Sequence, residues 1–371
     1  MTDNTTRTVE RTPVSLDDYE RLAQRVLDDN AWAYVAGGAG DELTLHWNRD
    51  AFQKYAILPR VLVKSDAPST SFELFGRTLT HPIIVAPLAY QRLLHPHGES
   101  ATALAAAAQE STMVLSTLAS TTIETAANVE GGSCRWFQLY MQERRDDTMS
   151  LVRRAEDAGY EAIVLTVDAP LSGARNREQR IGFRLPEGVR AENLVARPAT
   201  HQSSPDDGPT SAVFSEYLRN ASTWQDVEWL VGKTRLPVLI KGIAHPDDAD
   251  IAIQRGARGI IVSNHGGRTL DTIPATLDLL APIVDRTSER VPVLVDGGIR
   301  RGTDVYKCLA LGATAVLVGR PILYGLAVAG ARGVSHVLRI LRDEFEIAMM
   351  LSGCMTISQI TRDRLVRSHR M

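Results

Sequence analysis

The stretch VPVLVDGGIRRGTDVYKCLALGATAVLVGR, residues 291–320, contains the pattern that decides the fold. Two short apolar runs rich in β-branched residues, 293–295 and 315–318, flank a segment of helical composition at 303–311. Each run is continuously apolar rather than alternating, which is typical of parallel strands that are buried on both faces. The stretch therefore predicts a strand, a helix and a second strand of one parallel sheet.

The same alternation of strand and helix recurs along most of the chain. Eight apolar runs are present, at residues 83–86, 113–115, 136–139, 162–167, 238–240, 259–262, 293–295 and 315–318. Segments with helical composition or helix start signals lie between them, for example at 99–109, 147–158 and 247–255. Eight such units over roughly 240 residues match a (β/α)8 TIM barrel better than an open, doubly wound sheet. We therefore expect an α/β protein with one domain, 1–371, whose barrel occupies residues 81–350.

Two additions to the minimal barrel are expected. Residues 1–80 form a cap segment, with a helix at 15–27 and then the glycine-rich turn AGGAG at 36–40 over one mouth of the barrel. After the fourth strand, a long loop at 184–222 is rich in Pro, Ser, Asp, Thr and Gly between residues 196 and 211. Loops of this composition form mobile lids or disordered insertions, and both interpretations stay open. The next helix is expected to begin near Ser222 or Thr223.

Composition narrows the range of functions. The chain has 371 residues, of which 44% are hydrophobic and 23% charged, as expected of a soluble globular protein with a sizeable core. Its formal net charge of -3 provides no general positive field, so nucleic acid and anionic membranes are not expected partners. No run approaches the ~20 apolar residues of a membrane span, and residues 1–11 lack the apolar region of a signal peptide. The 3 scattered cysteines suit a reducing compartment, so we expect a cytoplasmic protein with small-molecule partners and no metal site.

The chemistry is expected at the C-terminal ends of the strands, where enzymes with this barrel carry their reactive groups. Lysine, histidine, arginine and hydroxyl side chains follow the runs there, although each alone could be an ordinary cap or turn residue. After the last two strands, DGGIR at 296–300 and the pair Gly319-Arg320 offer backbone N–H and guanidinium groups to a phosphate. Lys241, after the fifth run, could be a solvated charge, a Schiff-base nucleophile or a cation beside a flavin.

One further motif makes a family resemblance specific. The sequence SNHGGR at 263–268, with Lys241 upstream and DGGIR downstream, resembles the FMN-dependent 2-hydroxy acid oxidase and dehydrogenase family, which includes lactate, glycolate and mandelate oxidases. The resemblance covers nearly the whole chain, because further family motifs follow in the expected order. They are Tyr34 before the glycine-rich turn, APLA at 86–89, FQLY at 137–140, LTVD at 165–168 and Arg175.

The resemblance implies an FMN cofactor across the mouth of the barrel. The phosphate is expected on Gly297, Gly298, Arg300, Gly319 and Arg320. The ring is expected beside Ala89, Ser116, Gln138, Thr166, Lys241 and Ser263, with further cofactor contacts from Pro87, Leu88, Asp296 and Ile299. In this arrangement the Lys241 cation would stabilise the reduced ring.

The resemblance also implies the residues that act on the substrate. The catalytic residues are His265, Asp168, Tyr140 and Lys241, and the substrate-binding residues are Tyr34, Tyr140, Arg175, His265 and Arg268. His265 is the expected base, and Asp168 would stabilise the imidazolium that forms. Arg175 and Arg268 would bind the substrate carboxylate with two charged donors. Arg177 is a rival for this clamp, although the spacing from Asp168 favours Arg175.

The reaction implied is the oxidation of an (S)-2-hydroxy acid to the 2-oxo acid, with O2 as acceptor and H2O2 as product (EC 1.1.3). Leu118 stands where glycolate-oxidising relatives carry tryptophan, and residues 87–99 are similar to bacterial hydroxymandelate oxidases of the family. A wider apolar pocket favours mandelate or 4-hydroxymandelate, with lactate next. Because residues 196–211 are polar, docking to a membrane is not expected.

Three alternatives use the same motifs. A dehydrogenase of the family would pass electrons to a quinone or a carrier instead of O2. An FMN barrel similar to type 2 isopentenyl diphosphate isomerase would have to bind a diphosphate, for which a carboxylate clamp is unsuited. A catalytically inactive flavin-binding scaffold is not supported, because every catalytic position that the resemblance implies carries the expected residue. The family resemblance also implies a homotetramer or a homo-octamer.

Overall fold

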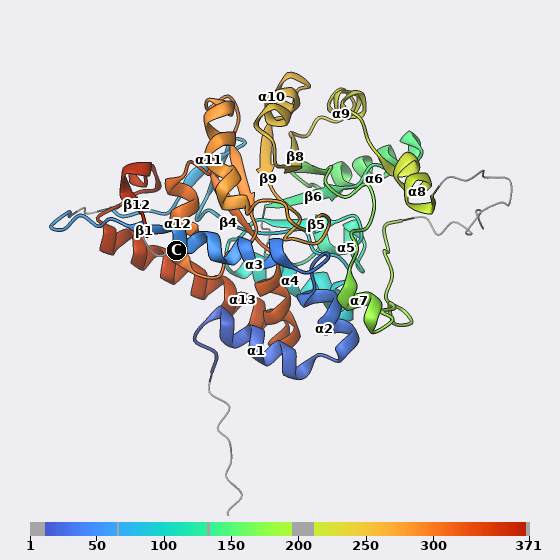
Figure 1. The fold of residues 1–371 in the computed structure, drawn as a ribbon, viewed down its shortest axis with the longest axis horizontal. Helices are drawn as coiled ribbons and strands as arrows, with labels where there is room; N and C mark the ends of the chain where they lie inside the picture. The colour runs from blue at the N-terminus through green and yellow to red at the C-terminus, as the bar shows by residue number, and fades with distance from the viewer. Residues whose placement is uncertain (1–11, 65–66, 132–133, 195–210, 369–371) are drawn as a thin grey trace, which may run out of the picture.

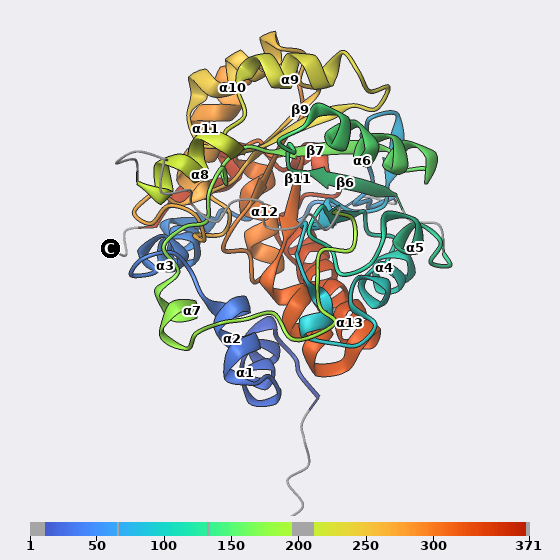
Figure 2. The same ribbon diagram turned by 90° about the vertical axis from the view of Figure 1, so that its right-hand side faces the viewer.

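The computed structural model describes residues 12–64, 67–131, 134–194 and 211–368. Within these residues, eight parallel strands close into a barrel in the order β10-β11-β4-β5-β6-β7-β8-β9, which confirms the predicted TIM barrel. The strands are β4 (Ile83–Val85), β5 (Met113–Ser116), β6 (Arg135–Leu139), β7 (Ala162–Thr166), β8 (Val238–Ile243), β9 (Gly259–Val262), β10 (Val293–Asp296) and β11 (Ala315–Val318). Figures 1 and 2 show the helices arranged around these strands.

The helices that follow the strands are α4 (Gly98–Ala108), α5 (Ile123–Ala127), α6 (Arg145–Asp157), α9 (Trp224–Val231), α10 (Pro246–Gln254), α11 (Thr276–Thr287), α12 (Gly302–Ala310) and α13 (Arg320–Ser352). Four of them, α4, α6, α10 and α12, had predicted bounds, and each lies within two residues of these bounds at both ends. The start of α10 shows the local reason: His245 caps the helix, and Pro246 follows at a position that needs no N–H donor. Helix α13 bends at Ala329 and Gly330, whose backbone angles are not helical.

The strands are continuously apolar because each one separates two apolar layers. Ile84 belongs to the inner cluster of the barrel together with Trp136 and Leu317. Its neighbours Ile83 and Val85 belong to the outer cluster, which packs against the helices. Alternate residues of a strand point to opposite faces, so both sets must be apolar in a strand that is covered on both sides.

One strand differs from its predicted bounds by more than one residue. β8 continues to Ile243, three residues beyond the predicted end at 240, and Lys241 pairs with Thr166 and Ile261 in the ladder. The charged side chain of Lys241 suggested that the strand ends before it. The backbone instead stays extended, and the register of β8 with β9 shifts between Lys241 and Ile243. Gly242 makes this possible, because its φ is +106° and a Cβ there would come within 2.5 Å of the Asp168 Cβ.

The N-terminal segment supplies three helices, α1 (Leu16–Val26), α2 (Asp29–Ala36) and α3 (Leu43–Asp50), and the first of them corresponds to the helix predicted at 15–27. Strand β1 (Tyr55–Ile57) pairs with β12 (Leu365–Arg367), and the hairpin β2 (Phe72–Leu74) and β3 (Arg77–Leu79) packs against the inner cluster. The glycine-rich turn at 36–40 touches the mouth of the barrel, where the N–H of Ala39 donates to the Gly267 carbonyl over 2.8 Å. The division into a cap at 1–80 and a barrel at 81–350 stays a prediction.

The predicted loop at 184–222 is described only in part, since residues 195–210 lie outside the described residues, as do 1–11 and 369–371. Residues 212–220 form helix α8 (Ala212–Asn220), which the loop prediction missed because the surrounding composition is polar. The helix expected near Ser222 or Thr223 is α9; Thr223 is its N-cap residue, and its N–H donates to the Asp226 carboxylate over 3.0 Å. A further short helix, α7 (Asn176–Arg180), lies against α2 (Figures 1 and 2). Among the described helices, none has both the length and the apolar composition that a bilayer crossing needs.

Candidate active site

A cavity opens at the C-terminal ends of the barrel strands. Its walls contain all but two of the residues predicted for the site, contributed by all eight strand ends and by the N-terminal segment. The predicted residues that line it are Tyr34, Pro87, Leu88, Ala89, Ser116, Gln138, Tyr140, Thr166, Arg175, Lys241, His265, Arg268, Asp296, Gly297, Gly298, Ile299, Arg300, Gly319 and Arg320. The other two do not line the cavity but contact residues that do: Asp168 contacts His265, and Ser263 contacts Lys241.

His265 lies between a carboxylate and a phenol. Its Nδ1 is 2.9 Å from Asp168 Oδ1, so the N–H at Nδ1 donates to the carboxylate and leaves Nε2 to face the cavity. Burial raises the pKa of Asp168, but the charges of His265 and Lys241 more than offset this and hold it below its usual value. The Tyr140 hydroxyl lies 3.5 Å from Nε2, and burial raises the Tyr140 pKa, which keeps the phenol protonated. The group is therefore arranged as a base with an anionic partner behind it.

The backbone at His265 has an unusual conformation. His265, Gly266 and Gly267 all have positive φ values, of 55°, 63° and 72°. For a side chain with a Cβ this conformation is costly, and it persists where the surroundings hold it. A pair of buried amides supplies that support: Asn48 Nδ2 donates to Asn264 Oδ1 over 2.9 Å, and Asn264 Nδ2 donates to Asn48 Oδ1 over 2.8 Å.

Replacing Asn48 by alanine is expected to destabilise the protein by about 1–3 kcal/mol, because the Asn264 amide and the Thr276 N–H then lose a buried partner. The free energy of unfolding measures this directly. Asn128→Ala, at an exposed helix end, is the matched control and should change stability by less than about 0.5 kcal/mol. Equal stability of the two variants would refute the role given to the amide pair.

Lys241 is a buried cation with two fixed partners. Its Nζ lies 3.1 Å from Asp296 Oδ2 and donates to Ser263 Oγ over 2.9 Å. Burial alone would lower its pKa, but the carboxylates of Asp296 and Asp168 raise it above the usual value. A lysine held in its charged form is not a nucleophile, so of the three readings of Lys241 the geometry favours the cation beside a flavin.

Unpaired polar atoms in the cavity match a flavin ring. Among the described residues, Gln138 Nε2, Thr166 Oγ1 and Asp296 Oδ1 are buried and have no hydrogen-bond partner. Buried polar groups are rarely left unpaired in folded proteins, so a ligand with both donors and acceptors along one edge is expected here. The N–H and carbonyl groups of an isoalloxazine ring provide both, and the Lys241 cation lies in the same wall.

The other end of the cavity suits a phosphate. Gly297 and Gly298 have φ values of 100° and 78°, and a Cβ on Gly298 would meet the Asn48 carbonyl oxygen at 2.0 Å, so this close turn requires glycine. Burial, reinforced by the neighbouring Arg268 charge, lowers the pKa of Arg320, whose guanidinium donates to backbone carbonyls of Val35, Gly37 and Gly266. An anion at this point would offset that destabilisation of the charged guanidinium.

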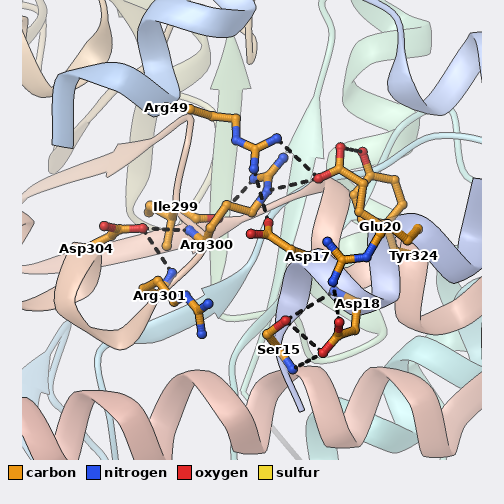
Figure 3. Close-up of polar contacts among 11 residues, drawn as sticks. Ser15, Asp17, Asp18, Glu20, Arg49, Ile299, Arg300, Arg301, Asp304 and Tyr324 are labelled. Atoms are coloured by element: carbon orange, nitrogen blue, oxygen red, sulfur yellow. Dashed lines mark hydrogen bonds and ion pairs between the residues drawn. The ribbon is translucent and has the colours of Figure 1, made fainter. Parts of the chain in front are cut away.

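A polar network fixes the turn that carries Arg300 (Figure 3). The Asp304 carboxylate accepts the N–H groups of Arg300 and Arg301, each over 2.9 Å. The Arg300 guanidinium donates to the Ile299 carbonyl and lies 4.0 Å from the Glu20 carboxylate of α1. The residues at both ends of the cavity therefore fit FMN.

Two guanidinium groups meet beside Tyr34. The Arg268 guanidinium lies 4.9 Å from the Tyr34 ring centre and donates to the Tyr34 and Gly37 carbonyls. Arg175 lines the same cavity, and its buried Nε has no partner among the described residues. Arg177, the rival candidate, is absent from the cavity wall and pairs with Glu42. The geometry thus favours Arg175 and Arg268 as the pair that binds a carboxylate.

Sequence reasoning missed several residues of the site. Val35 and Leu323 line the cavity, and Glu178 contacts both guanidinium groups. Asn48 supports the His265 turn from a distant part of the chain. These residues carry no motif that one sequence can reveal, because their role depends on contacts made after folding.

Comparisons with known proteins agree with this site. A family model described as FMN-dependent dehydrogenase matches residues 23–367. The chain is 50% identical to an L-lactate oxidase of Roseobacter sp. over 95% of both chains. It is 43% identical to glycolate oxidase 1 of Zea mays over 94% of both chains. Among solved structures, mandelate oxidase with (S)-2-phenylpropionate has a TM-score of 0.86 at 43% identity, covering 96% of this chain and 99% of that one.

The chain belongs to the FMN-dependent 2-hydroxy acid oxidase and dehydrogenase family. Within it, the chain is an FMN-dependent oxidoreductase of the 2-hydroxy acid oxidase type, and its cofactor is FMN. The fold, the unpaired atoms of the cavity and the clamp all agree with this assignment.

Proposed function

We propose that this enzyme oxidises (S)-2-hydroxy acids whose side chain is larger than that of glycolate to the 2-oxo acids, with O2 as acceptor and H2O2 as product. One observation carries the proposal: an imidazole whose Nδ1 is bonded to Asp168 faces the same cavity as two partly buried guanidinium groups. A 2-hydroxy acid presents a carboxylate to the guanidinium groups and a proton to the imidazole. The cytoplasmic location and the homotetrameric or homo-octameric assembly stay predictions.

In the proposed mechanism the chain binds, orients and deprotonates the substrate. Arg175 and Arg268 hold its carboxylate by charge-assisted hydrogen bonds, with the Tyr34 hydroxyl as a further donor. The Nε2 of His265 accepts a proton, either from the α-carbon or from the hydroxyl, and Asp168 stabilises the resulting imidazolium. The protonated Tyr140 hydroxyl donates to the substrate oxygen. FMN, when bound, would supply the two-electron redox chemistry that connects the oxidation of the α-carbon with the reduction of O2 to H2O2.

The walls near the clamp favour a substrate with an apolar side chain. Leu118 borders the main cavity and also a second one that continues outward from Tyr140 and Arg175. Apolar side chains of this second cavity include Met141, Val167, Leu171 and Leu194, and charged ones, among them Glu143, Asp147 and Arg154, line it as well. A 2-hydroxy acid held by its carboxylate would therefore have space beside its side chain, with Leu118 as an apolar contact and a wall of mixed polarity beyond it.

Two substrates follow from this argument, each supported by a different observation. Mandelate, the first expectation from the sequence, is supported by the space beyond Leu118 and by the similarity to mandelate oxidase structures. L-lactate is supported by the higher identity, 50% and 48%, to two L-lactate oxidases. Steady-state O2 consumption and H2O2 formation with (S)-mandelate, 4-hydroxymandelate, L-lactate and glycolate distinguish them. Turnover with a quinone but not with O2 would favour the dehydrogenase alternative instead.

Leu118→Trp is expected to narrow the pocket and to lower kcat/KM for mandelate relative to that for glycolate by about 10- to 200-fold. The indole would fill the space that a phenyl group needs, while glycolate has no side chain to displace. Leu104→Trp places the same change on an exposed position of α4 and should leave the ratio unaltered. A mandelate-to-glycolate ratio that is the same in Leu118→Trp and wild type would contradict the proposed position of the substrate side chain.

A further inference from the structure

Glu178 is an acidic residue that turns inward from a half-exposed helix. It lies in α7, three residues after Arg175, and its side chain is 13% exposed, although none of the α7 residues is fully buried. The reaction implied by the family motifs gives it no part. A carboxylate in such a place requires partners, because burying an unpaired charge is expensive.

Its partners are the two guanidinium groups of the clamp. Glu178 Oε1 lies 3.3 Å from Arg175 Nη1 and 3.2 Å from Arg268 Nη2, so a single carboxylate oxygen joins both. The other nitrogen at the end of Arg268, Nη1, donates to the Tyr34 and Gly37 carbonyls. Both guanidinium groups are thus fixed from the side of α7.

This arrangement leaves the inner edge of Arg175 available. Its Nη1 is engaged by Glu178, whereas its buried Nε has no partner among the described residues and the side chain lines the cavity. A planar guanidinium held at one end presents its remaining N–H groups in a fixed direction. Two guanidinium charges and one carboxylate leave a net charge of about +1 at the clamp, which one substrate carboxylate neutralises.

We propose that Glu178 is a positioning residue of the substrate clamp: its carboxylate holds Arg175 and Arg268 in the orientation in which their remaining N–H groups meet the carboxylate of the substrate. This inference rests on the proposed function, because it assumes that the two arginines bind the substrate. In this proposal the acidic side chain of Glu178 promotes the binding of an acidic substrate, because it orients the two arginines that bind the substrate carboxylate. The geometry also allows the opposite effect, in which Glu178 competes with the substrate, and the experiment separates the two.

The test measures binding of oxalate, a small dicarboxylate, to the FMN-loaded enzyme through the change in flavin absorbance, alongside kcat and KM. Glu178→Ala should raise the oxalate dissociation constant by about 10- to 100-fold, since both arginines lose the acceptor oxygen that orients them. Glu178→Gln keeps an acceptor oxygen at the same reach and should restore most of the affinity. Glu192→Gln, in an Arg–Glu pair outside both cavities, is the matched control and should bind oxalate as the wild type does.

Two outcomes would overturn the proposal. Unchanged oxalate binding and KM in Glu178→Ala would show that the arginines need no support, and tighter binding would show that Glu178 competes with the ligand. If Glu178→Ala does not retain FMN, Glu178→Asp takes its place in the test. The shorter aspartate side chain keeps the negative charge but moves it away from the arginines. A KM of Glu178→Asp equal to that of the wild type would then refute the proposal. Failure of the wild type itself to oxidise any 2-hydroxy acid would instead refute the proposed function, whereas oxalate binding would still report on Glu178.

Discussion

Replacing His265 by asparagine is expected to slow the reduction of the bound flavin by a 2-hydroxy acid by about 10²–10⁴-fold. The imidazole Nε2 is the base that faces the cavity, and Asp168 Oδ1 at 2.9 Å from Nδ1 stabilises its protonated form. An asparagine amide cannot accept a proton at neutral pH. Anaerobic stopped-flow measurement of the flavin absorbance gives the rate without interference from the step with O2.

The same variant should retain FMN, since His265 is not among the residues that fit the ring or the phosphate. The flavin-to-protein absorbance ratio checks this. His245→Asn is the matched control, because His245 is exposed and caps α10, a role that asparagine can also fill. If His265→Asn reduced its flavin at the wild-type rate, His265 would not be the catalytic base.

Arg175→Met should lower kcat/KM by a factor of about 30 to several thousand, the range for truncating one partner of a buried, hydrogen-bonded charge pair. The substrate carboxylate would lose a charged donor, while methionine preserves much of the apolar stem. Steady-state kinetics with L-lactate and mandelate measure the effect.

Arg177→Met provides the comparison, because Arg177 lies in α7, two residues after Arg175, but does not line the cavity and pairs with Glu42, the residue before α3. Its kcat/KM is expected to remain close to the wild-type value. The reverse pattern, with a large loss in Arg177→Met and none in Arg175→Met, would show that the wrong arginine had been assigned to the clamp.

Much of the fold was predictable because its signal is local. Ile83, Ile84 and Val85 are all apolar for different reasons, since the middle residue faces the barrel interior and the other two face the helices. A continuous run of this kind is visible without knowing any partner. The end of β8 was harder to predict, because Lys241 is polar for a functional reason while its backbone still belongs to the sheet.

The residues of the site also differ in whether a local sequence signal predicts them. His265, Lys241 and the DGGIR turn occur in ordered motifs, so the sequence alone pointed to them. Glu178 and Asn48 could not be found in this manner: their partners, Arg268 and Asn264, are 90 and 216 residues away in the chain. Their roles are properties of tertiary contacts, which no periodicity or spacing in a single sequence contains.

The most direct test of the central claim is anaerobic mixing of the FMN-loaded enzyme with the (S)- and (R)-enantiomers of lactate and mandelate while the flavin absorbance is recorded. The flavin should be bleached by an (S)-enantiomer and far more slowly by its mirror image, because the clamp and His265 fix which substituent faces the base. Absence of bleaching by every acid, in an enzyme that holds its full complement of FMN, would contradict the central claim.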